Sequence, residues 1–168
     1  MITIKQKLDK IIAVMLMVIM AVMVTNVTWQ VFSRYILQSP SSFTDELSRY
    51  LLVWLGMLGA AYVAGQNSHL AIDLLPTKLY GKAKQRLLMV IDVVIILFVI
   101  PVMILGGSNL VYITYTLEQK SATLQLPLAY VYIIIPFSGL LVLFYQFADI
   151  KKILNENPSQ INSKWKNI

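Results

Sequence analysis

The sequence predicts an all-α membrane protein with four transmembrane helices. Of its 168 residues, 58% are hydrophobic and 13% are charged, whereas soluble domains average about 45–50% apolar and about 25% charged residues. A helix needs about 20 apolar residues to cross a membrane, and the chain contains four such stretches. We therefore assign residues 1–150 to a four-span membrane domain and residues 151–168 to a polar cytoplasmic tail.

The first span is predicted at residues 11–33 and the second at residues 47–66. Residues Ile11–Phe32 carry no charge over 22 positions, which is too long for the apolar region of a signal peptide, about 7–15 residues. The second stretch runs without charge from Tyr50 to Gly65. We expect both stretches to be retained as helices.

The third span is predicted at residues 87–112 and the fourth at residues 127–148. Pro101 and the pair Gly106–Gly107 predict a bend in the third span, because proline and glycine are common causes of helix kinks. Pro127 suits the first turn of a helix, and Pro136 and Gly139 predict a kink in the fourth span. The four spans leave no room for a large extramembrane domain.

The segment 72–86 mixes leucines with lysines. It is interpreted either as a short amphipathic helix lying along the membrane surface or as an ordinary basic loop, and the sequence favours neither.

Lysine and arginine are unevenly distributed between the predicted loops. The amino-terminal segment, the 67–86 loop and the tail carry eleven of the fourteen, and the other side has only Arg34, Arg49 and Lys120. Because basic residues concentrate in cytoplasmic loops, we expect both termini in the cytoplasm. The lysines form no dense basic run, so nucleic acid is excluded as a partner. The chain also has no cysteine, which excludes disulfides and thiolate metal sites.

Asn26, Gln30 and Arg34 recur at every fourth position of the first span and so share one helical face. Amide side chains inside a span face protein, because lipid offers no hydrogen-bond partner. The stripe either lines a substrate path or joins this helix to its neighbour. We favour the second interpretation, because the stripe is short and Arg34 can reach water at the interface.

Asp45, Glu46 and Arg49 cluster at the start of the second span. Their spacing allows Arg49 to pair with either acid on the helix surface, and acids near a helix beginning are favourable. Arg34 supplies a second cation from the neighbouring helix end. Exposed pairs contribute only about 0–1 kcal/mol, so we predict that Arg34, Asp45, Glu46 and Arg49 dock a partner at the outer face of the membrane or brace the helix ends there.

Small residues recur along the second span, which also carries Trp54 near its outer end. Such faces let another helix approach closely. We predict that this group packs within the bundle or against another subunit: Trp54, Gly56, Gly59, Ala60 and Ala64.

The remaining candidate residues are His69, Asp73 and Asp92. Asp92 lies inside the third span, where a carboxylate is costly, and we expect it to bond to water or to the His69–Asp73 region at the cytoplasmic end. A membrane haem needs two axial ligands, or one histidine and a substitute, and a zinc site around one histidine would need all its companions from Asp and Glu because the chain has no cysteine; we therefore expect neither group. With no catalytic or phosphate-binding motif present, we expect no enzyme, no metal and no cofactor on this chain.

The run RYILQSPSSFTDELSRYLLVWLGMLGAAYVAGQNSHLAIDLLP resembles the small membrane subunit, the Q or DctQ type, of tripartite ATP-independent periplasmic (TRAP) transporters. The similarity covers about a quarter of the chain, and Asp45 stands where the family pattern usually has glutamate. The residues that match the pattern are Arg34, Tyr35, Phe43, Asp45, Glu46, Arg49, Trp54, Gly56, Gly59, Ala60, Ala61, Gly65, His69 and Asp73.

The resemblance implies a scaffold subunit in the bacterial inner membrane. Its partners would be membrane lipid, a large membrane subunit that carries the substrate and sodium sites, and a soluble periplasmic binding protein that it helps to dock. The cargo would be an organic acid, such as sialic acid or a four-carbon dicarboxylate. Two alternatives stay open: a stand-alone oligomeric channel or carrier, which only Asn26 and Gln30 support, and a membrane anchor for a redox enzyme.

Overall fold

The computed structural model describes residues 2–39, 41–66 and 82–155. Most of these residues are helical, and four helices are long and apolar enough to cross a membrane: Lys5–Tyr35, Ser42–Gly65, Gln85–Thr116 and Leu128–Lys151. The predicted all-α membrane protein with four transmembrane helices is thus confirmed. His69 and Asp73 lie outside the described residues, as does most of the 72–86 segment, whose end at Lys82–Arg86 belongs to the third helix.

Helices α1 and α2 both begin before their predicted spans. Helix α1 covers Ile2–Tyr35, so the polar beginning of the chain continues into the first span without a break. Helix α2 covers Ser42–Gly65 and begins five residues before the predicted position 47, with Ser41 in extended conformation directly before it. The early start places Asp45 and Glu46 within the first turns of α2.

The third membrane helix is continuous but changes its geometry in the middle. It consists of α3 (Lys82–Phe98), a π-helical segment η2 (Val99–Gly106) and α4 (Gly107–Thr116). Pro101 lies in η2, and since proline lacks an N–H and crowds the preceding turn, wider hydrogen bonding accommodates it. The predicted bend at Pro101 and Gly106–Gly107 thus coincides with a widened segment.

The fourth membrane helix is divided into α5 (Leu128–Tyr132) and α6 (Ile134–Asn155), with a break at Ile133. Pro136 explains the break, because its missing N–H leaves the carbonyl group of Tyr132, four residues earlier, without a helical partner. Helix α6 continues to Asn155, seven residues beyond the predicted end of the span. The first part of the expected tail is therefore helical, and residues 156–168 lie outside the described residues.

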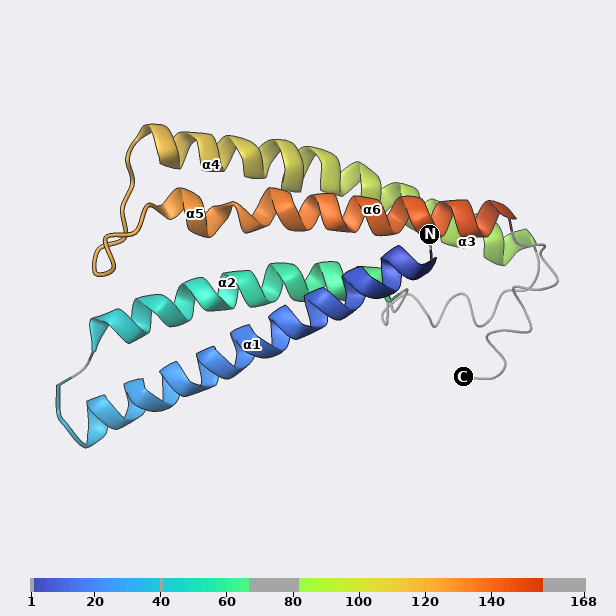
Figure 1. Ribbon diagram of the computed structural model, residues 1–168. Helices are drawn as coiled ribbons and strands as arrows, with labels where there is room; N and C mark the ends of the chain where they lie inside the picture. Colours follow the sequence, from blue (N-terminus) through green and yellow to red (C-terminus); the bar gives the residue numbers. More distant parts are fainter. Residues whose placement is uncertain (1, 40, 67–81, 156–168) are drawn as a thin grey trace.

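Figure 1 shows α1 beside α2, and α5–α6 between α2 and the long helix formed by α3, η2 and α4. Helix α1 packs chiefly on α2. We call the end where α1 stops at Tyr35 and α2 starts at Ser42 the loop end. The opposite end, where α1 begins and α6 finishes, is the terminal end.

The core lies where α2, η2 and α6 meet. Ala61 and Ala64 of α2 pack there with Val99 and Val142. Glycines bring the backbones close together: a Cβ atom at Gly139 would lie 3.0 Å from Cβ of Met103. Small residues thus replace bulky side chains at the contacts between these helices, as is usual in membranes.

Candidate functional site

The loop ends of α1 and α2 are joined by the amide of Asn26. Its Nδ2 donates to the backbone oxygen of Thr44 and to Oγ of Ser48, both at 2.7 Å. The Ser48 hydroxyl in turn donates to the same Thr44 oxygen at 2.9 Å. Asn26 therefore fixes α1 against the first turns of α2, which is the interhelical contact that we favoured over a substrate path.

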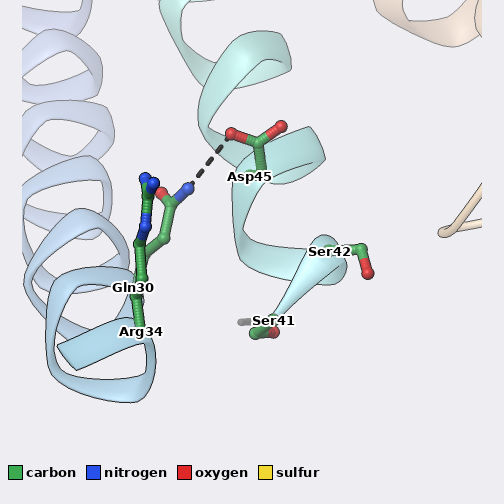
Figure 2. Close-up of a pocket in the computed structure, with 5 residues that line it drawn as sticks. All are labelled: Gln30, Arg34, Ser41, Ser42 and Asp45. Carbon is green, nitrogen blue, oxygen red and sulfur yellow. Dashed lines mark hydrogen bonds between the residues drawn. The ribbon is translucent and has the colours of Figure 1, made fainter. Parts of the chain in front are cut away.

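Gln30 continues this contact one turn further along α1. Figure 2 shows its Nε2 pointing to Asp45, and the bond to Asp45 Oδ1 is 3.1 Å long. The other oxygen, Oδ2, pairs with Nη2 of Arg49 at 2.6 Å. The Arg49 side chain is 76% exposed, so Asp45 is engaged on both oxygens while Arg49 still faces outward.

Arg34 borders a pocket beside this chain of contacts. The pocket has a volume of about 380 Å³ and is lined by Gln30, Arg34, Ser41, Ser42 and Asp45. The Arg34 guanidinium lies 5.9 Å from the ring centre of Tyr35 and forms no ion pair with the residues that the structure describes. It therefore remains available as a cation at the loop end.

Glu46 points to a different partner from its neighbour Asp45. Its carboxylate accepts hydrogen bonds from three successive backbone N–H groups in the loop between α4 and α5, those of residues 122, 123 and 124, at 3.1, 2.9 and 3.0 Å. The hydroxyl of Tyr50 donates to it at 2.8 Å. The sequence predicted a possible pair with Arg49 for this acid, and nothing in the local pattern indicated the distant loop.

The predicted packing residues of α2 divide into two groups. Trp54 and Ala64 face the chain's own helices: Nε1 of Trp54 donates to the backbone oxygen of Val131 at 3.1 Å, and Ala64 is buried in the core. Gly56, Gly59 and Ala60 face away from the helices that the structure describes. A Cβ atom at either glycine would meet no atom within 4 Å, and Ala60 is exposed.

A second polar cluster lies at the terminal end. Lys5 pairs with Asp149 at 3.4 Å, and the Tyr145 hydroxyl donates to Asp9 at 2.6 Å. The sequence pattern did not single out these four residues, because each is an ordinary charged or aromatic residue near a helix end. Only the spacing of Lys5 and Asp9, one helical turn apart, gave a local signal.

Asp92 is also buried at this level of the bundle. It is 6% exposed, and its Oδ2 has no hydrogen-bond partner among the described residues. The side-chain amide of Gln146 is buried in the same way. The expected bond from Asp92 to the His69–Asp73 region falls outside the described residues and stays a prediction.

The chemistry of both clusters is that of hydrogen bonding and charge. Within the described residues, no group of three or more His, Cys, Asp or Glu side chains could hold a metal ion. The polar residues at the loop end hold α1, α2 and the α4–α5 loop together through Asn26, Gln30, Asp45 and Glu46. The same end presents Arg34 and Arg49 outward. This arrangement suits recognition of another protein.

Comparison with known proteins matches residues 23–156 to the sequence profile described as "Tripartite ATP-independent periplasmic transporters, DctQ component". The chain is 26% identical, over 82% of its length and 76% of the relative's, to the sialic acid TRAP transporter small permease protein SiaQ of Vibrio cholerae. It is 36% identical to a TRAP transporter small permease protein of Haemophilus influenzae, over 45% of this chain and 48% of that protein.

Proposed function

The chain belongs to the DctQ family of TRAP transporters, and we propose that it is the scaffold subunit of such a transporter, one that imports an organic acid with sodium. As a small TRAP permease subunit it is a multi-pass inner-membrane protein of a transporter. We further propose that it binds a large membrane subunit, which carries the substrate and sodium sites, and that it helps to dock a periplasmic binding protein.

The observation that carries the scaffold role is the uncovered face of α2. Gly56, Gly59 and Ala60 lie on one side of this helix, between Leu52 and Val63, which are 58% and 45% exposed. A surface of small residues allows a second helix to approach closely in a membrane. Since the helices that the structure describes leave this surface open, we propose that a helix of the large subunit packs there.

The proposed cargo rests on the family and on one relative. That relative is named as a component of a sialic acid transporter, and sialic acid is a carboxylate. We therefore propose a carboxylate cargo, with a four-carbon dicarboxylate as the other candidate. No cofactor is expected on this chain, and an absorption spectrum of the purified protein would reveal a haem if that expectation is wrong.

The proposed docking of a binding protein concerns the loop end. Eleven of the fourteen lysines and arginines fall in three sequence segments, the amino-terminal segment, residues 67–86 and the tail. Since basic residues concentrate on the cytoplasmic side, the loop end is expected to face the periplasm. Arg34 and the exposed Arg49 lie at that end. Reversing the charge of Arg49 should lower uptake while the chain still inserts and assembles, and unchanged uptake would remove Arg49 from the docking surface.

Co-purification with the large subunit tests the scaffold role. Gly56→Leu and Ala60→Leu place bulk on the uncovered face of α2, and we expect each to reduce the amount of large subunit recovered with a tagged chain. Ala21→Leu, at an exposed alanine on α1, is the matched control and should leave recovery unchanged. Equal recovery for all three variants would place the interface elsewhere.

A stand-alone channel or carrier requires a polar path that is open to water. Asn26 and Gln30 were its only support in the sequence, and both donate hydrogen bonds to α2. The purified chain in liposomes should therefore transport nothing, whereas substrate flux without the other two components would favour the channel.

A further inference from the structure

The loop between α4 and α5 is longer than joining two helices requires. It covers the eleven residues 117–127 between Thr116 and Leu128, whereas connections in helical bundles typically take about 2–8 residues. Figure 1 shows it leaving α4 at the loop end and reaching across toward the beginning of α2. Its length therefore serves something other than connection.

The loop also has a defined conformation. Ser121 N donates to Leu126 O and Leu128 N donates to Gln119 O, both at 2.9 Å. Glu118 and Gln125 adopt positive φ angles of 47° and 54°, which are uncommon for residues other than glycine and persist only where the surroundings hold them. The loop is thus an ordered element at the end of the bundle.

Glu46 holds this element from another helix. The three backbone N–H groups and the Tyr50 hydroxyl that donate to its carboxylate fill the about four acceptor positions that a carboxylate offers. Hydrogen bonds to an ionised acceptor are also among the stronger ones in proteins. Glu46 is therefore already occupied within the chain and has little capacity left for a docking partner.

The side chains that the loop presents are mixed in character. Leu117 and Leu126 are 63% and 48% exposed, and Glu118, Lys120 and Gln125 are exposed beside them. A transient protein interface is about as apolar as the rest of a water-exposed surface, and the mixed side chains of the loop fit such an interface, whereas the membrane helices expose mainly apolar side chains. Since the loop lies beyond the ends of α4 and α5, its natural partner is a protein in the water phase.

We propose that the α4–α5 loop is the docking element for the soluble binding protein and that Glu46 is a positioning residue that keeps the loop in its docking conformation. This inference rests on the proposed function and names the contact surface within it. A loop that is ordered before binding loses less conformational freedom on association, which improves affinity without any added contact. Glu46 therefore supports docking by holding the backbone of the α4–α5 loop, while the side chains of that loop contact the binding protein.

The test uses the full transporter complex in lipid nanodiscs, with a spin label on Gln125→Cys. The chain has no natural cysteine, so labelling the purified chain before it is assembled with the large subunit confines the label to that position. In the Glu46→Ala variant we expect a more mobile label and about tenfold weaker binding of the binding protein, because the loop must then be ordered during docking. Recovery of the large subunit with the variant shows that it is folded.

Asp45→Ala is the matched control. It removes a neighbouring carboxylate that bonds to Gln30 and Arg49 but to no loop atom, so the label should stay as immobile as in the wild type. Leu126→Ala removes a proposed contact instead, and it should weaken binding without changing the mobility of the label.

Two results would overturn the inference while leaving the proposed function intact. One is a mobile label in Glu46→Ala with unchanged affinity for the binding protein. The other is a label that stays immobile in that variant. If the wild-type complex does not bind the binding protein at all, the docking part of the proposed function fails, and the inference fails with it.

Discussion

A methyl group added at Gly65 would overlap the ring of Tyr145. Gly65 is the last residue of α2, and a Cβ placed there would lie 2.7 Å from Cζ and 2.8 Å from Cε1 and Cε2 of that ring. Carbon atoms pack best at about 3.5–4.0 Å. Gly65→Ala therefore requires the ring or the helix to move by most of an ångström.

The ring has little freedom to move. Tyr145 is 0% exposed, its hydroxyl donates to Asp9 at 2.6 Å, and the Lys5 ammonium lies 5.6 Å from the ring centre. Overpacking a tight contact typically costs about 1–3 kcal/mol. Alanine regains up to about 1 kcal/mol through its higher helix propensity, so we expect Gly65→Ala to lower the free energy of unfolding by up to about 2 kcal/mol.

Gly56→Ala is the matched control on the same helix. A Cβ at Gly56 would meet no atom within 4 Å, so only the gain in helix propensity remains, about 0.5–1 kcal/mol in the stabilising direction. Both variants replace glycine by alanine. Their free energies of unfolding should differ by about 2 kcal/mol, which corresponds to about 30-fold in the unfolding equilibrium constant.

The assay is reversible unfolding of the purified chain in mixed detergent micelles, with increasing sodium dodecyl sulfate and circular dichroism as the readout of helix content. Tyr145→Leu shortens the side chain that causes the overlap. Gly65→Ala should therefore cost less in a Tyr145→Leu background than in the wild type, as a double-mutant cycle would measure. Equal stability of Gly65→Ala and Gly56→Ala, or full additivity in the cycle, would refute the close approach of α2 and α6.

Three further predictions use the same unfolding assay. Asn26→Ala should lower the free energy of unfolding by about 1 kcal/mol, because it removes two hydrogen bonds between α1 and α2. Thr28→Ala is the control, since this hydroxyl donates only within its own helix, and it should lower the free energy of unfolding by less. A larger loss for Thr28→Ala than for Asn26→Ala would contradict the role of Asn26. Trp54→Phe should cost about 1 kcal/mol, because it leaves the oxygen of the buried Val131 without its donor; wild-type stability would show that this bond contributes nothing. Asp92→Asn should raise stability by about 1 kcal/mol, because a buried carboxylate with an unpartnered oxygen becomes neutral; a loss of stability would indicate a counter-charge beside it.

The sequence by itself determined the fold class and the number of membrane helices. Apolar runs of membrane length have few alternatives to a helix, because lipid cannot satisfy exposed backbone groups. The same local rules indicated that Asp45 and Arg49 can pair one turn apart, and the order of residues from Arg34 to Asp73 was enough to suggest the family. The ends of the helices were less well predicted, because polar helical turns extend beyond the apolar runs at Ile2 and Asn155.

Only the tertiary structure decided which polar and small residues face inward. Glu46 and Asp45 are adjacent in sequence, yet one holds a loop more than 70 residues away and the other joins Gln30 to Arg49. Gly56 and Gly65 are the same residue type on one helix, yet among the described residues a Cβ at Gly65 would meet the Tyr145 ring of α6, whereas a Cβ at Gly56 would meet no atom within 4 Å. Periodicity assigns residues to a side of a helix, whereas the partner on that side depends on how helices far apart in the chain pack together.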